Sequence, residues 1–148
     1  GADADGDARP DRIDWDRVHF LGRVPYSAYR QIIQISRCHI YLTVPFVLSW
    51  SLLESMSMGA TVVASDVAPV REAVEHERTG LLVDFFRPDA LAQQVIEVLQ
   101  RPEDFSHLGR LARDFVVETH DFHTRTLPVH LERINALLPR ARRICMPR

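Results

Sequence analysis

The stretch PFVLSWSLLESMSMGATVVA, residues 45–64, decides the class of fold. It follows a β-rich run at 39–44 and begins with Pro45, which ends that run. Residues 51–58 indicate a short helix, and Gly59 stands where helices commonly end in a left-handed cap. Residues 61–64 then form an apolar run typical of a buried strand. This order predicts parallel strands joined by a crossover helix.

The same alternation extends through the chain in both directions. Apolar runs at 18–21 and 81–83 predict two further buried strands, the first ending at Gly22 and the second opened by Gly80. Apolar residues at helical spacing predict helices over 26–33, 70–75, 91–99, 108–115 and 127–138. Because the strand runs are apolar on both faces, the predicted fold is α/β, a doubly wound parallel sheet with helices on both sides.

Composition limits the remaining choices. The chain has 148 residues, 46% hydrophobic and 26% charged, which suits one core-forming domain. Its net charge of -2 gives no support to binding of nucleic acid or an anionic membrane. Cys38 and Cys145 have no paired spacing, which indicates a reduced, cytoplasmic protein. We expect a mobile acidic lead-in at 1–15, a partial α/β domain at 16–139 and a basic tail at 140–148.

Ligands of doubly wound sheets bind at the carboxyl ends of the strands. That rule selects the loops 22–26, 45–51 and 65–69 as the candidate site. The helix that follows the second loop points its unpaired N–H groups and positive dipole end into the same region, which suits a diphosphate. Glu54, near the start of that helix, is placed to accept hydrogen bonds from sugar hydroxyls.

Several motifs resemble the C-terminal domain of family 4 glycosyltransferases. LESMSMGATVVA at 53–64 is similar to the family's Leu-Glu-Ala-Met-Ala-x-Gly-x-Pro-Val-Val-Ala. The segments VHFLGRV at 18–24, PVREAV at 69–74 and ERTGLLV at 77–83 also match family segments, in the same order. The resemblance covers roughly residues 18–120. It implies that residues 16–139 are a partial nucleotide-sugar-binding domain, the Rossmann-like half of a GT-B fold that lacks its first two strands.

The resemblance also implies a function and a site. A nucleotide-sugar donor would be the substrate of a retaining transfer that needs no cofactor and no metal, and the acceptor domain would lie outside this chain. Glu54 matches a family glutamate that contacts the donor ribose. The segment 47–51 matches the backbone that meets the donor phosphate and sugar, and two residues of the 22–26 loop match the part near the base. The implied donor-binding residues are Arg23, Val24, Leu48, Ser49, Trp50, Ser51 and Glu54.

One position departs from the family pattern. Phe46 stands where the family carries a first glutamate that addresses the transferred sugar, and a phenyl ring accepts no such hydrogen bond. Either Ser49, Ser51 or backbone groups handle the sugar, or the chain is a non-catalytic interaction domain that keeps the half-fold.

Other residues of the candidate site have simpler interpretations that stay open. Ser51 and Glu54 have the spacing of a capping box, so Glu54 has a structural alternative. Trp50 is either a stacking ring or a core aromatic. Absence of the first two strands would separate the 18–21 strand from the sheet, so that it re-pairs locally, pairs with another copy to form a homo-oligomer, or stays loose.

Overall fold

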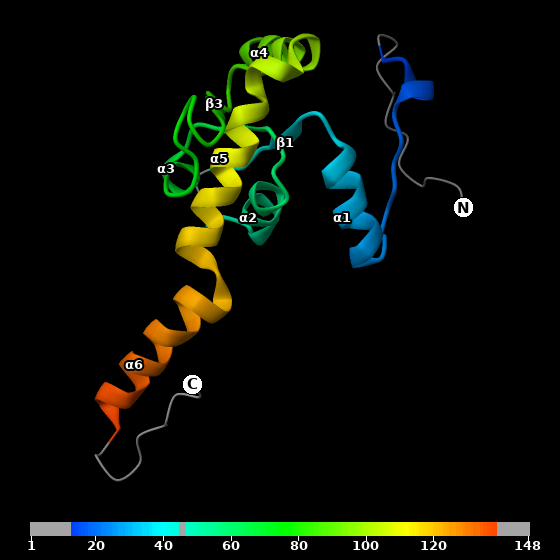
Figure 1. The fold of residues 1–148 in the computed structure, drawn as a ribbon. Helices are drawn as coiled ribbons and strands as arrows, with labels where there is room; N and C mark the ends of the chain where they lie inside the picture. Colours follow the sequence, from blue (N-terminus) through cyan, green and yellow to red (C-terminus); the bar gives the residue numbers. More distant parts are fainter. Residues whose placement is uncertain (1–12, 45–46, 139–148) are drawn as a thin grey trace.

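Strands alternate with helices in the computed structural model, which describes residues 13–44 and 47–138 (Figure 1). The lead-in up to residue 12, Phe46 and the basic tail lie outside the described residues, so the predictions made for them remain predictions. The elements in chain order are the 3-10 turn η1 (Trp15–Arg17), α1 (Tyr26–Ile35), β1 (His39–Tyr41), α2 (Trp50–Ser57), β2 (Val62–Ser65), α3 (Ala68–Arg71), β3 (Leu81–Val83), α4 (Pro88–Gln100), α5 (Pro102–His120), the π-helical turn η2 (Phe122–Thr126) and α6 (Leu127–Leu137).

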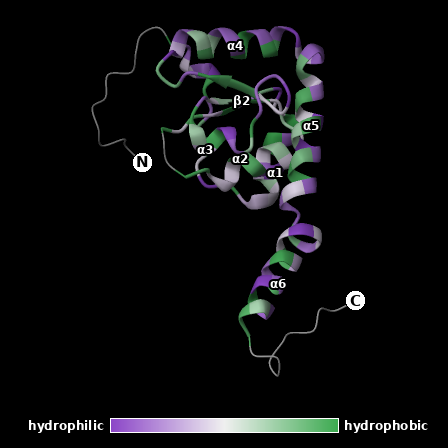
Figure 2. Ribbon diagram, turned by 90° about the vertical axis from the view of Figure 1, so that its left-hand side faces the viewer, coloured by the Kyte–Doolittle hydropathy of each residue, from purple (hydrophilic) through white to green (hydrophobic). Residues whose placement is uncertain are grey.

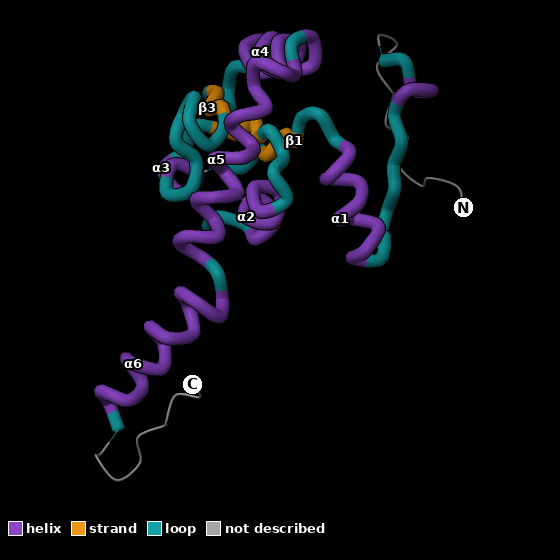
Figure 3. Tube along the Cα trace, in the orientation of Figure 1, coloured by secondary structure: helices purple, strands orange, loops and turns teal. Residues whose placement is uncertain are grey.

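The three strands form one parallel sheet in the order β1-β2-β3 (Figure 3). Tyr41 pairs with Ala64 in the first ladder, and Ser65 pairs with Val83 in the second. β2 is the central strand, and all four of its residues are buried. The predicted parallel sheet is therefore confirmed, and the predicted left-handed cap at Gly59 is present with φ 79°.

Helices cover both faces of this sheet. Val62 and Ala64 point to one face, where they pack with α2, α3 and α5. Val63 points to the other face and packs with β3, α4 and the first part of α5. Because strand side chains alternate between faces, β2 divides the core into two clusters. Figure 2 shows apolar residues on the sheet and on the helix surfaces that turn toward it.

The predicted strand at 18–21 is wrong. This segment has no strand pairing among the described residues, and Phe20 is 80% exposed. The apolar run had predicted a strand, but a strand also needs a neighbour to take its backbone hydrogen bonds. β1 pairs only with β2 within the described part of the chain, so the 18–21 segment does not occupy its other edge. The structure excludes local re-pairing of this segment among the described residues, and its pairing with another copy stays a prediction.

The first and last long helices of the chain are less buried than the others. α1 buries only Ile33, and α6 buries none of its residues. Figures 1 and 2 both show α6 running away from the sheet. No helix in the described part of the chain is long and apolar enough to cross a membrane.

The reactivity of the Cys38 thiol measures how well the core beneath α4 is packed. Its side chain packs against the cluster around Val63 and Val98, and this apolar setting raises the pKa of the Cys38 thiol to about 11. Since the thiolate is the reactive form, we expect labelling of Cys38 by a disulfide reagent at pH 8 to be at least about 100-fold slower in the folded chain than in denaturant. A Cys145→Ser background removes the other thiol. Labelling at the same rate in both states would place Cys38 at the surface.

Candidate functional site

Two hydrogen-bonded contacts fix the ends of the loop between β1 and α2. The backbone N–H of Thr43 donates to Ser65 Oγ at 3.0 Å, and Ser65 Oγ donates to the Thr43 carbonyl at 2.8 Å. At the other end, the backbone N–H of Ser49 donates to the hydroxyl of Tyr41 at 3.0 Å. Ser65 and Tyr41 are buried residues of the sheet. The core therefore holds the loop where the carboxyl ends of the strands meet.

Ser49, not Ser51, is the N-cap of α2. Its side chain accepts from the backbone N–H of Ser51 at 3.3 Å, and the two hydroxyl groups lie 3.1 Å apart. The capping-box interpretation of Ser51 and Glu54 is therefore wrong, because the helix begins one residue earlier than the sequence predicts. Leu52, Ser55 and Met56 are fully buried and anchor the helix on the sheet.

Trp50 stands at the first position of α2 and is 81% exposed. The core-aromatic alternative for this residue is therefore wrong in the structure. Leu48, by contrast, packs partly against the core cluster under α2. The loop is thus anchored by Leu48 and presents an open indole ring at the start of the helix.

Glu54 lies one turn into α2 and meets a residue from a distant segment. The hydroxyl of Tyr26 donates to Glu54 Oε1 at 3.1 Å, across 28 residues of sequence. This hydrogen bond raises the pKa of Tyr26 above its usual value. The contact brings Tyr26, the last residue of the 22–26 loop, to Glu54, whereas Arg23 and Val24 are exposed. Sequence reasoning had selected this loop but had missed the role of Tyr26.

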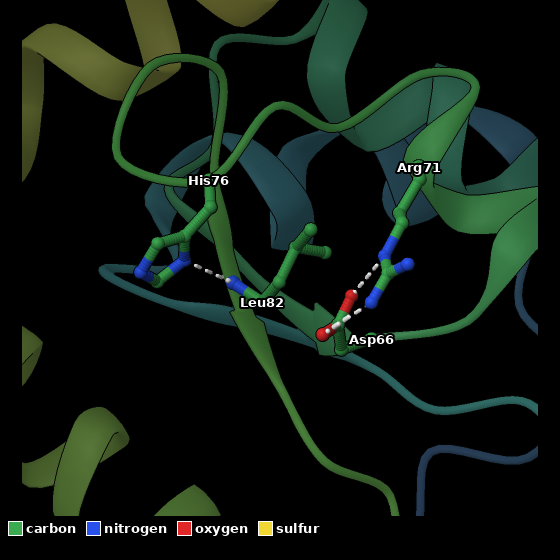
Figure 4. A network of polar contacts seen from close by, with 4 residues as sticks. All are labelled: Asp66, Arg71, His76 and Leu82. Atoms are coloured by element: carbon green, nitrogen blue, oxygen red, sulfur yellow. Dashed lines mark hydrogen bonds and ion pairs between the residues drawn. The ribbon is translucent and has the colours of Figure 1, made fainter.

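Asp66 of the third predicted loop forms a two-point ion pair with Arg71 of α3. Arg71 donates from Nε to Asp66 Oδ1 at 2.5 Å and from Nη2 to Asp66 Oδ2 at 2.8 Å (Figure 4). The hydrogen bonds from Arg71 hold the pKa of the Asp66 carboxyl below its usual range. Beside this pair, the backbone N–H of Leu82 donates to His76 Nδ1 at 2.9 Å. Arg71 is therefore occupied by Asp66, and a phosphate at this position would have to displace a carboxylate.

A cavity of about 330 Å³ lies between α3 and α5 and is lined in part by Arg71, the partner of Asp66 from the third loop. It is lined by Arg71, Glu72, Ala73, Glu75, Arg78, Thr79, Leu111, Asp114, Phe115 and Glu118. Both arginines are already in ion pairs, Arg71 with Asp66 and Arg78 with Glu75. Three carboxylates of the lining, Glu72, Asp114 and Glu118, lie outside these ion pairs, which disfavours a diphosphate there. Within the described ranges, no cluster of three or more metal-ligating side chains occurs.

The sequence family follows from a direct comparison. The family described as Glycosyl transferases group 1 matches residues 3–101. The chain belongs to this family. One characterised relative, N-acetyl-alpha-D-glucosaminyl L-malate synthase of Bacillus anthracis, is 29% identical over 103 residues, which are 70% of this chain and 26% of that protein.

Solved structures similar to this group 1 glycosyl transferase chain show the same fold. Sucrose-phosphate synthase of Thermosynechococcus elongatus matches with a TM-score of 0.71 and 25% identity, over 82% of this chain and 31% of that one. Anabaena HepE in complex with UDP-glucose matches with a TM-score of 0.61 and 17% identity, over 72% of this chain and 29% of its own. These matches confirm the Rossmann-like half of a GT-B fold. The chain spans about a quarter to a third of the length of these relatives.

Proposed function

We propose that this chain supplies the nucleotide-sugar-binding part of a retaining, metal-independent glycosyltransferase. The observation that carries the proposal is the arrangement at the start of α2, where the Ser49-capped helix terminus and the Glu54 carboxylate lie together beside the carboxyl end of β1. A helix start attracts the negative charge of a diphosphate, and a half-buried carboxylate accepts hydrogen bonds from sugar hydroxyls. Membership of the group 1 family supports the same assignment.

Each remaining residue of the site has a proposed role. The hydroxyl groups of Ser49 and Ser51 and the backbone of Leu48 and Trp50 would meet the diphosphate and the transferred sugar, because the N–H groups of Ser49 and Ser51 already donate to Tyr41 and Ser49. Glu54 would bind the ribose. The open indole ring of Trp50 would stack on the base or the sugar, since an aromatic face can cover a flat or apolar ring surface. Arg23 and Val24 would lie near the base, because Tyr26 holds their loop beside Glu54.

Binding of a nucleotide sugar tests the proposal directly. We expect one of UDP-glucose, GDP-glucose and ADP-glucose to stabilise the chain, and the complex of Anabaena HepE makes UDP-glucose the first to test. At about 100 times its Kd, the ligand should stabilise by about 2.7 kcal/mol and raise Tm by about 5–10 °C. Thermal unfolding followed by circular dichroism measures the shift. No shift with any of the three, at concentrations up to about 10 mM, would contradict the proposal.

A non-catalytic interaction domain is the second candidate, because Phe46 replaces the glutamate that the family places against the transferred sugar. The two candidate functions predict different affinities for the sugar nucleotide and for the nucleoside diphosphate. If the donor is used, the sugar nucleotide should bind more tightly than the nucleoside diphosphate alone, through groups near Ser49 and Ser51. An interaction domain that has lost the site should bind neither.

The partners of the site are also proposals. Because the chain spans only 26% of one relative and 31% of another, we infer that the acceptor is bound by a domain outside this sequence. The outer edge of β1, which no described strand covers, is proposed to pair with a strand from that larger protein or from a second copy. Sedimentation that shows a monomer at high concentration would exclude the second copy.

A further inference from the structure

We propose that Tyr26 is the residue that positions the Glu54 carboxylate for the donor, by holding one of its oxygens and leaving the other available. This inference rests on the proposed function, and it adds a residue that neither the family motifs nor the helix start identifies. Its basis is the hydrogen bond of 3.1 Å from the Tyr26 hydroxyl to Glu54 Oε1.

The two carboxylate oxygens of Glu54 have different surroundings. Oε1 is occupied by Tyr26, whereas Oε2 has no hydrogen-bond partner among the residues that the structure describes. The backbone of Glu54 is fixed by α2, whose neighbouring residues Ser55 and Met56 are fully buried. A half-exposed glutamate side chain on a fixed backbone still samples several rotamers. A hydrogen bond to one carboxylate oxygen selects one rotamer. This lowers the entropy cost that a ligand bound to the other oxygen has to overcome.

Tyr26 is itself held in place. It is the first residue of α1 and follows Pro25, whose ring restricts the backbone at this point. Its ring stacks on Tyr29, with centroids 5.9 Å apart and planes inclined by 30°. The pKa of Tyr26 is raised, chiefly by the hydrogen bond to Glu54, so its hydroxyl keeps its proton and serves as the donor. Tyr26 is 59% exposed, so Pro25 and the ring contact with Tyr29 are what restrict it and allow its hydroxyl to orient the carboxylate.

The same contact has an opposite interpretation, in which Tyr26 covers Glu54 and must leave before the donor binds. The two interpretations predict changes of opposite sign when the hydroxyl is removed. A positioning residue strengthens donor binding, so its loss weakens binding. A covering residue competes with the donor, so its loss tightens binding.

The test compares Tyr26→Phe with Tyr29→Phe in the full chain, by calorimetric titration with UDP-glucose or whichever of the GDP- and ADP-glucose probes binds the unsubstituted chain. Tyr29 is the matched control, because it loses the same hydroxyl from the adjacent stacked ring, where that group is buried and has no partner among the described residues. We expect Tyr26→Phe to raise Kd by about 3- to 10-fold, as for loss of a partly exposed hydrogen bond to a charged group, and Tyr29→Phe to leave Kd unchanged.

A double variant distinguishes positioning from a general effect on the fold. In a Glu54→Ala background, Tyr26→Phe should cause no further loss of affinity, because the hydroxyl acts only through that carboxylate. Tm of Tyr26→Phe should stay near that of the unsubstituted chain, and Tyr29→Phe, which removes a buried hydroxyl that has no partner among the described residues, should not lower Tm. An unchanged or tighter Kd for Tyr26→Phe, or a full additional loss in the Glu54→Ala background, would overturn the inference while the proposed function stands. Failure of all three probes to bind the unsubstituted chain would remove both.

Discussion

Replacing Gly109 by alanine is expected to destabilise the fold by about 2–4 kcal/mol and to lower Tm by about 5–15 °C. Gly109 lies on α5 where that helix crosses the turn after α2. A Cβ atom built on Gly109 overlaps the carbonyl oxygen of Gly59 and lies 2.9 Å from its carbonyl carbon. Backbone atoms cannot turn aside as a flexible side chain can, so one helix must move. The gain of about 1 kcal/mol from alanine in a helix offsets only part of this cost.

Urea unfolding followed by circular dichroism measures the effect, and Arg110→Ala is the control. Arg110 is the next residue of the same helix and is exposed, so its substitution should change the free energy of unfolding by less than about 0.5 kcal/mol. If Gly109→Ala were as stable as the unsubstituted chain, α5 would have to lie further from the Gly59 turn than the structure shows.

The second large effect concerns the donor. We expect Glu54→Ala to weaken binding of the nucleotide sugar by about 10- to 100-fold, because a hydrogen bond to a charged group contributes about 1.5–3 kcal/mol. Glu54 is half-buried at the start of α2, and its Oε2 is without a partner among the described residues. Glu54→Gln keeps an acceptor oxygen and should lose less affinity. Calorimetric titration gives Kd for each variant.

Glu118→Ala is the matched control for this measurement. It removes the same carboxylate from α5, where Glu118 lines the cavity between α3 and α5. Its Kd should equal that of the unsubstituted chain. The reverse pattern, in which Glu118→Ala loses affinity and Glu54→Ala does not, would move the donor from the strand ends to that cavity.

The strands could be predicted from the sequence wherever the chain itself supplies a neighbour. The apolar runs at 39–44, 61–64 and 81–83 all contain strands, because β2 pairs with β1 on one side and with β3 on the other. The run at 18–21 has the same apolar character but no partner in the described chain. Apolar character shows that a segment can be buried. Whether the segment forms a strand depends on a neighbouring strand that takes its backbone hydrogen bonds.

The sequence predicted which loops form the candidate site. The contacts and exposure of individual side chains in those loops depend on the tertiary structure. Ser49 and Ser51 are equivalent caps by residue type, and the point at which α2 begins decides between them. The contact between Tyr26 and Glu54 joins two helices far apart in sequence, and no periodicity within either segment indicates it. Trp50 shows the same limit, since its exposure depends on how the loop before α2 is held. The roles of these residues toward a donor remain predictions.

The position of α5 has a consequence for how this chain unfolds. Leu108 belongs to the core cluster on one face of the sheet, and Ala112, about one turn later, belongs to the cluster on the other face. A single rigid segment is thus shared by both layers at the point where Gly109 meets the turn after α2. Neither layer can open without releasing the helix that closes the other. The sheet and its helices should therefore melt together in one cooperative transition, with no stable half-open state between.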